Sequence, residues 1–180
     1  MGGGHTSAGA GITRILSAAL VVFCLWATPT AASQTYPGPP TVEQLARRAD
    51  VVVIGDVTAA TGELAAAGGI HTRISLTAVE TLKGAPSPSL SFTQIGGRVG
   101  DRMSAVGGAA QFTAGERVLV FLARRPDGSL RLSDLIHGKF LIDRDAATGR
   151  DYAVRFTGAP GADRIALDEV RAQVRRTLGS

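Results

Sequence analysis

Short strand-like segments separated by turn residues limit most strongly what this chain can fold into. Between Val51 and Phe156, apolar or alternating runs follow one another, separated by Gly, Pro, Asp and Ser residues without an intervening helical period. Parallel strands need crossover connections, usually helices, so this order argues against βαβ units and favours an antiparallel barrel or sandwich. The strands are predicted at residues 51–57, 70–76, 90–94, 118–122, 130–132, 139–143 and 150–156.

Two of these segments, Val51–Val57 and Val118–Leu122, are apolar on both faces and are expected at the centre of the fold. Residues 70–76 instead alternate between apolar and polar side chains, as a half-buried strand does. The alternation slips near Val79, which predicts a β-bulge. Residues 61–69 are mostly small and predict a loop between the first two strands.

A short helix is predicted at each end of the strand series. Thr41 and Gln44 have the spacing of a capping box, and residues 42–49 place apolar side chains on one face. Residues 167–178 also have one apolar face, with acidic side chains in the first turn and arginines in the last, an order that suits the helix dipole. The sequence thus predicts a mainly β fold of five to seven short strands with an N-terminal helix and a C-terminal helix.

The first 33 residues have the composition of a secretory signal peptide. Arg14 supplies a positive charge, the apolar run Ile15–Trp26 follows, and small residues precede a predicted cleavage site between Ser33 and Gln34. This run of about a dozen residues is shorter than the roughly 20 needed to span a bilayer. We expect an exported protein, secreted or held in the periplasm or cell envelope, with no stable membrane anchor after cleavage. A retained anchor and a lipoprotein at Cys24 are the alternatives.

Cleavage would leave residues 34–40 as a proline-rich tether and residues 41–180 as a single domain. The only cysteine, Cys24, would leave with the leader, so the mature protein would be free of disulfides and of cysteine metal sites. A domain of about 140 residues can bury enough apolar surface to be stable without disulfides.

Four short motifs follow one another in the predicted domain: Ala49–Val57, Glu80–Gly84, Gly115–Leu122 and Asp127–Leu130. In this order they resemble the netrin-like module and the inhibitory domain of the tissue inhibitors of metalloproteinases. The Lys83-Gly84 turn, the Gly96-Gly97 segment and Gly138–Phe140 are similar above all to an uncharacterised family of exported bacterial proteins. The resemblance covers about residues 41–143. It implies an OB-like antiparallel barrel with flanking helices.

One departure from the inhibitors limits what this resemblance implies. Those proteins bind the protease zinc through the amine and carbonyl of a mature N-terminal cysteine, whereas this chain would begin at Gln34, or at Ser33 after the alternative cut behind Ala32. Zinc chelation therefore does not carry over, and the resemblance implies the barrel without that mechanism of inhibition.

The sequence offers few candidates for catalysis. It contains neither a His-Glu-x-x-His zinc motif nor a Gly-x-Ser-x-Gly nucleophile motif. His71 and His137 are expected to be solvated or structural, and Ser129 and Ser133 to serve turns or strand ends. We therefore predict no catalytic residue and no cofactor, and we do not expect an enzyme.

Three aspartates surround a predicted hairpin tip and could together hold a calcium ion through their carboxylate oxygens: Asp143, Asp145 and Asp151. Aspartates at such a tip also favour turn geometry, and Arg144 and Arg150 would compete for the same carboxylates. Both interpretations of this hairpin stay open from the sequence.

Residues 95–111 contain five glycines and little periodicity, which predicts a long loop or a pair of turns. One interpretation is a tightly turned connection. The other is a recognition loop at the rim of the barrel, because barrels of this type commonly bind partners through their loops. The candidate partner-binding residues are Gly96, Gly97, Arg98, Asp101, Arg102 and Met103.

The formal net charge of the chain is +4, its basic residues are scattered, and aromatic residues make up only 5%. Binding of nucleic acid needs clustered charge and stacking rings, so it is not expected. We expect instead a non-enzymatic exported binding module that recognises an extracytoplasmic protein or glycan. The alternatives are an inhibitor of an extracellular protease that does not use an N-terminal cysteine, and an envelope hydrolase of unknown type.

Overall fold

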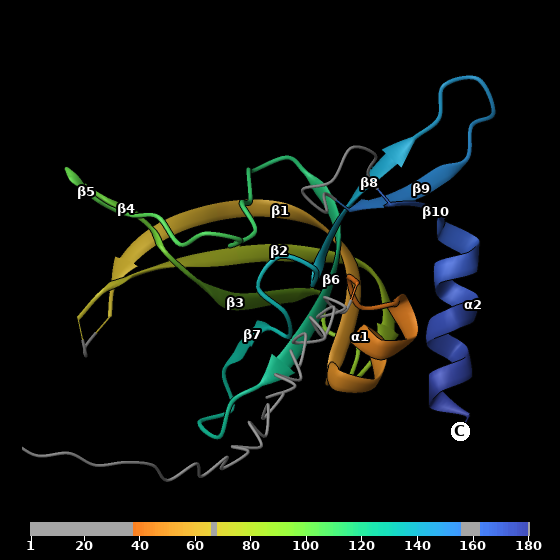
Figure 1. Cartoon of the computed structure of the whole chain (residues 1–180), viewed down its shortest axis with the longest axis horizontal. Helices are drawn as coiled ribbons and strands as arrows, with labels where there is room; N and C mark the ends of the chain where they lie inside the picture. Colours follow the sequence, from red (N-terminus) through yellow and green to blue (C-terminus); the bar gives the residue numbers. More distant parts are fainter. Residues whose placement is uncertain (1–37, 66–67, 156–162, 180) are drawn as a thin grey trace, which may run out of the picture. The chain divides into compact units, whose positions relative to one another are not determined.

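A computed structural model describes residues 38–65, 68–155 and 163–179, which all belong to one compact unit, Pro37–Ser180 (Figure 1). The helices are α1 (Val42–Arg48) and α2 (Leu167–Leu178). The strands are β1 (Val51–Leu64), β2 (Ile70–Lys83), β3 (Ser89–Ile95), β4 (Gly97–Val99), β5 (Arg102–Ser104), β6 (Arg117–Arg124), β7 (Leu130–Leu132), β8 (Lys139–Arg144), β9 (Asp151–Arg155) and β10 (Asp163–Ala166). The predicted leader, its cleavage site at Ser33 and Gln34, and residues 34–37 of the predicted tether lie outside the described residues.

Five of the strands close into a barrel in the order β1–β2–β3–β7–β6, and β6 pairs back with β1. Neighbouring barrel strands are antiparallel except β3 and β7, which run parallel and meet at a single residue pair, Thr93 and Arg131. The predicted fold class, a mainly β, OB-like barrel with a helix near each end, is therefore confirmed.

β6 joins the barrel to the rest of the sheet. One of its edges pairs with β1, from Leu122 opposite Val51 to Arg117 opposite Asp56. The other edge is shared, because β7 pairs with its last residues and β8 with its first half. β9 and β10 then extend the sheet beyond the barrel.

β1 and β2 form a long hairpin. β1 continues to Leu64, which pairs with Ile70, so the loop predicted at residues 61–69 is wrong over its first four residues. Small side chains weaken strand propensity, but the neighbouring β2 supplies a complete ladder of partners. The bulge predicted at Val79 is confirmed, because Ile54 pairs with Glu80 while the next residue of β1 pairs with Ala78.

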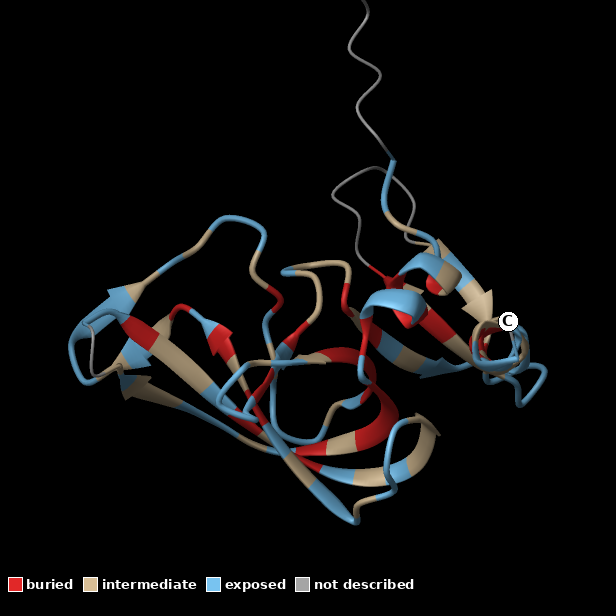
Figure 2. Cartoon of the chain, turned by 90° about the horizontal axis from the view of Figure 1, so that it is seen from below, coloured by how far each residue is buried: buried red, intermediate tan, exposed pale blue. Residues whose placement is uncertain are grey.

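Two hydrophobic cores lie on opposite sides of the barrel wall, and Figure 2 marks their residues as buried. Residues Val118, Val120 and Leu122 of β6 belong to the core inside the barrel. Leu119 and Phe121 of the same strand belong to the core that includes residues of both helices. Residues 118–122 are apolar on both faces because β6 separates these two cores.

The two helices are fixed by local and distant contacts. Thr41 and Gln44 form the predicted capping box: the Gln44 backbone N–H donates to Thr41 Oγ1 at 3.2 Å, and the Thr41 N–H donates to Gln44 Oε1 at 2.9 Å. Arg171 of α2 donates to Glu80 of β2 at 2.7 Å. Within the described ranges, no helix is long and apolar enough to cross a membrane.

Candidate functional site

The residues predicted as a recognition loop form a two-stranded ribbon, β4–β5. Gly97 pairs with Ser104, Arg98 with Met103, and Val99 with Arg102. The prediction of a long loop or a pair of turns did not include these strands, because backbone pairing between two short strands needs no periodic side-chain pattern. The ribbon lies beside the end of the β1–β2 hairpin that is remote from the helices (Figure 1).

The two glycines at the base of the ribbon hold it in place. The Gly96 N–H donates to the Ile70 carbonyl at 2.9 Å, and Thr72 Oγ1 donates to the Gly96 carbonyl at 2.8 Å. Gly96 and Gly97 have φ values of +87° and +133°, which favour glycine. A Cβ on Gly97 would lie only 2.2 Å from Thr72 Oγ1. Both glycines thus position the ribbon, and neither has a side chain to present to a partner.

A third glycine also makes room for the ribbon at this base, and this role was not predicted. Gly62 lies in β1 where the ribbon crosses the hairpin, and a Cβ there would be 1.9 Å from the Arg98 carbonyl oxygen. The small residues around Gly62 predicted a loop at 61–69, so the sequence did not mark Gly62. The available signal for Gly62 was a glycine within a strand, because such glycines often mark a close approach of another backbone segment.

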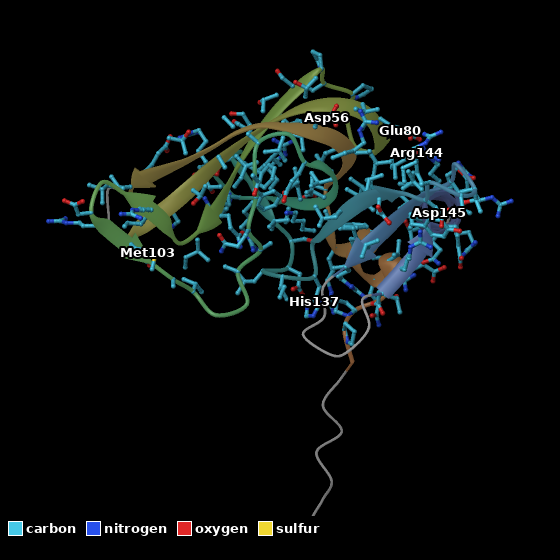
Figure 3. All side chains as sticks on the ribbon, turned by 90° about the horizontal axis from the view of Figure 1, so that it is seen from above. Asp56, Glu80, Met103, His137, Arg144 and Asp145 are labelled. Carbon is cyan, nitrogen blue, oxygen red and sulfur yellow. The ribbon has the colours of Figure 1, made fainter. Side chains whose placement is uncertain are left out.

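Exposed apolar and charged side chains surround the ribbon. Met103 is 72% exposed, Leu64 at the end of β1 is 57% exposed, and Ile95 just before the ribbon is 44% exposed (Figure 3 labels Met103). Arg98 Nε donates to the Gly100 carbonyl at 3.0 Å. Among the described residues, no carboxylate pairs with Arg98 or Arg102. We call the following set the ribbon surface: Leu64, Ile95, Arg98, Asp101, Arg102 and Met103.

One ion pair lies on the hairpin next to this surface. Arg73 donates to both carboxylate oxygens of Glu63, at 2.7 and 2.9 Å. This hydrogen bonding lowers the pKa of Glu63 and keeps its carboxylate charged. Both side chains are about half exposed, so the pair contributes little to stability. Arg73 neutralises the carboxylate of Glu63, so Glu63 does not offset the charge of Arg98 and Arg102.

The three calcium candidates are engaged by protein groups. Asp145 accepts from the backbone N–H groups of Ala147 and Thr148 at 3.0 and 2.9 Å, and the Thr148 N–H is the main cause of its lowered pKa. Arg164 of β10 lies 3.3 Å from Asp145 and 3.7 Å from the carboxylate of Asp143. Arg144 lies 3.5 Å from Asp151 (Figure 3 labels Arg144 and Asp145).

Asp143, Asp145 and Asp151 are therefore not arranged as ligands of a calcium ion. In the part of the chain that the structure describes, no three acidic, histidine or cysteine side chains gather in a way that could hold a metal ion. The arginines compete for these carboxylates, as one interpretation predicted, but Arg164 contributes and Arg150 does not. The turn geometry that was the alternative explains the position of Asp145.

His137 has an acidic neighbour but, in the part of the chain that the structure describes, no hydroxyl bonded to it. Its Nδ1 lies 3.0 Å from Asp134 Oδ1, and both side chains are about one-quarter exposed (Figure 3). The adjacent Ser133 hydroxyl is buried without a hydrogen-bond partner. No hydroxyl of the described residues bonds to His137, so a nucleophile–base pair of the serine-hydrolase kind is not formed there. His71 lies on β2 opposite Glu63 and Ile95.

A pocket of about 350 Å³ lies beside β8 and β9, and its lining is mostly apolar. The titratable group in its lining is Lys139, whose Nζ is 2.6 Å from Glu116 and also donates to the Gln111 carbonyl. The Lys139 ammonium is therefore held by Glu116 and the Gln111 carbonyl at the side of this pocket. The other lining residues are Gly108, Ala109, Ala110, Gln111, Ile136, Leu141 and Val154.

Comparison with known proteins adds no family assignment, since neither a family model nor a curated protein matches the chain. The barrel, the ribbon and the charges around it are thus the observations from which a function can be argued.

Proposed function

We propose that this protein is an exported, non-enzymatic binding module that recognises an extracytoplasmic protein through the ribbon surface. The observation that carries this proposal is the exposure of Met103, Leu64 and Ile95 beside two arginines that lack carboxylate partners among the described residues. Methionine and arginine are enriched in protein interfaces. A ribbon whose base is fixed by backbone contacts also loses little conformational freedom on binding.

The proposal also includes export and a relation to netrin-like modules, and both rest on the sequence. The composition of residues 1–33 supports cleavage and export, and the motifs in residues 41–143 support a relation to netrin-like modules. A closed five-stranded barrel is compatible with that relation, although many unrelated proteins share such barrels. Inhibition of an extracellular protease and hydrolysis of an envelope substrate stay as untested predictions, and assays of the purified protein against secreted proteases would test the first.

The ribbon surface can be tested by capture and direct binding. The purified protein and its Met103→Asp variant would be used to capture proteins from secreted and envelope fractions, and binding of an enriched protein would then be measured by calorimetry. A charge placed at the centre of an apolar contact should weaken binding about tenfold or more.

Val79→Asp is the matched control, because Val79 is an exposed apolar residue of β2, 54% accessible, outside the ribbon surface. It should leave binding unchanged within about twofold. Equal loss of binding in both variants, or no protein enriched over an unrelated bait, would rule out recognition through the ribbon surface.

A further inference from the structure

Arginines from three segments gather beside an incomplete part of the barrel wall. β3 and β7 meet at one residue pair, and among the described strands none pairs with residues 89–92 of β3 on the β7 side. A cleft of about 300 Å³ lies there, between β3 and the β6–β7 hairpin. We call it the arginine cleft, after its polar lining residues: Arg73, Arg124, Ser89, Ser91, Thr93 and Ser129.

Two more arginines border this cleft. Arg131 lies opposite Thr93 in the strand register, and Arg125 Nη1 donates to Thr93 Oγ1 at 3.0 Å. Arg124 Nη1 donates to the Gly128 carbonyl at 2.9 Å. A guanidinium group has five N–H donors, so most donors of these side chains stay available for a ligand.

The acidic groups near the cleft offset part of its charge. Glu63 neutralises Arg73, and Asp127, which accepts from the backbone N–H and hydroxyl of Ser129 at 2.9 and 2.7 Å, keeps its negative charge near Arg125. Asp50 accepts from the backbone N–H of Arg124 at 2.6 Å. Across the described residues, no carboxylate forms an ion pair with the side chains of three of the arginines: Arg124, Arg125 and Arg131. Together with these three carboxylates, the four arginines leave a net charge of one positive unit at the cleft.

We propose that the arginine cleft binds an acidic sugar unit of an anionic polysaccharide. Carboxylate or sulfate groups of the sugar accept hydrogen bonds from the planar guanidinium groups, which suit bidentate pairing. The sugar hydroxyls exchange hydrogen bonds with Ser91, Thr93 and Ser129. The cleft volume is at the lower end of that of small-ligand sites, about 300–1,000 Å³, which fits a single unit of a longer chain.

The lining favours such a sugar over nucleic acid. The aromatic residue in the lining, Phe92, is 2% exposed and belongs to the barrel core, so it offers no ring on which a base could stack. The cleft lies on β2, residues 89–93 of β3 and the β6–β7 hairpin, whereas the ribbon surface lies on the β4–β5 ribbon, the end of β1 and the last residue of β3, Ile95. The two sites are made of different residues, and this inference goes beyond the proposed function.

Calorimetry with oligogalacturonate as the acidic saccharide and dextran oligosaccharide as the neutral one tests this inference. The purified protein should bind oligogalacturonate and not dextran. The double variant Arg124→Gln, Arg125→Gln should weaken that binding about tenfold or more, because it removes two charge-assisted donors. Thr93→Val should also weaken it while leaving the charge unchanged.

The matched control is the double variant Arg150→Gln, Arg175→Gln, which removes the same charge from two exposed arginines outside the cleft. It should bind within about threefold of the unchanged protein. Equal weakening in both double variants, equal binding of dextran, or tighter binding of polyphosphate or single-stranded DNA would overturn the inference. Circular dichroism and thermal melts would check that each variant is folded. Met103→Asp should not alter saccharide binding, so failure at either site is separable from failure at the other.

Discussion

At the scale of single residues, one missing side chain determines where the ribbon can lie. Gly62 leaves room for the Arg98 carbonyl oxygen, which would be 1.9 Å from a Cβ at this position. We predict that Gly62→Val displaces the ribbon and destabilises the protein by about 1–3 kcal/mol, as overpacking of a close contact does. Urea denaturation measures the stability, and amide hydrogen exchange of residues 97–104 measures the displacement.

Thr61→Val is the control for this change, because Thr61 is the exposed neighbour of Gly62 on the same strand. It should leave the exchange rates of the ribbon unchanged. Equal protection of residues 97–104 in Gly62→Val and in the unchanged protein would show that the contact does not position the ribbon.

The sequence predicted several residues correctly and missed others for a physical reason. Thr41 and Gln44 act locally, so their spacing alone predicted the capping box. Gly62 and Arg164 act through partners far away in the sequence, Arg98 and Asp145, which no local pattern contains. The residues predicted for the recognition loop, from Gly96 to Met103, do lie on one ribbon, although two of the glycines position it instead of facing solvent.

At the scale of elements, the two helices begin differently. α1 has its capping box, whereas the N-cap of α2 is Ala166, which forms no side-chain hydrogen bond. Glu169 already occupies the third helical position, so Ala166→Ser would complete a second capping box. We predict that this change stabilises the protein by about 0.5–1 kcal/mol in urea denaturation.

Thr41→Ala is the converse change, and it should destabilise the protein by about 1 kcal/mol through the loss of the α1 cap. If Ala166→Ser lowered stability instead, Glu169 would have to be held by its contact with Gln173, at 3.2 Å, and unable to reach back.

Among the elements, those with a strong local period or a clear turn were predicted best. Residues 118–122 and 130–132 became β6 and β7 because Pro126–Ser129 fixes the turn between them. β10 was missed because its four residues carry no alternation of their own and are held by pairing with β9.

At the scale of the whole molecule, several carboxyl groups together make stability depend on pH. Hydrogen bonds from Arg117, Arg73 and Ser129 lower the pKa values of Asp56, Glu63 and Asp127, and the Thr148 N–H does so for Asp145. Each carboxyl therefore binds its proton more weakly in the folded state than in the unfolded one. Their contribution is complete above the unfolded values, about 4, and is lost as the pH falls through the lowered folded values.

We predict that the thermal midpoint is nearly constant from about pH 8 to 6 and falls steeply below about pH 4. Melts followed by circular dichroism across this range would measure it. The Asp145→Asn variant should show a smaller loss at low pH, because one of the four groups no longer titrates. A midpoint that rose on acidification would contradict the assignment of these hydrogen bonds.

The charge pattern is likewise a property of the whole fold. Arg73, Arg124 and Arg131 are scattered in the sequence, which argued against any concentrated positive site. Barrel closure brings the strands that carry them to one cleft. The clustering of these arginines depends on the order of the strands in the sheet. Hydrophobic periodicity predicts strands but not their order, so the sequence did not predict the cleft.

The shared pairing of β6 also bears on how this molecule can fold. β6 supplies the partner edge for β1, β7 and β8, and its pairing of Leu122 with Val51 joins segments about seventy residues apart. A chain that has so far produced only residues up to Ile95 holds three strands with an unpaired edge on either side. Such edges recruit other chains. We therefore expect that chains shortened before β6 aggregate more readily than the whole chain, independently of what the finished surface binds.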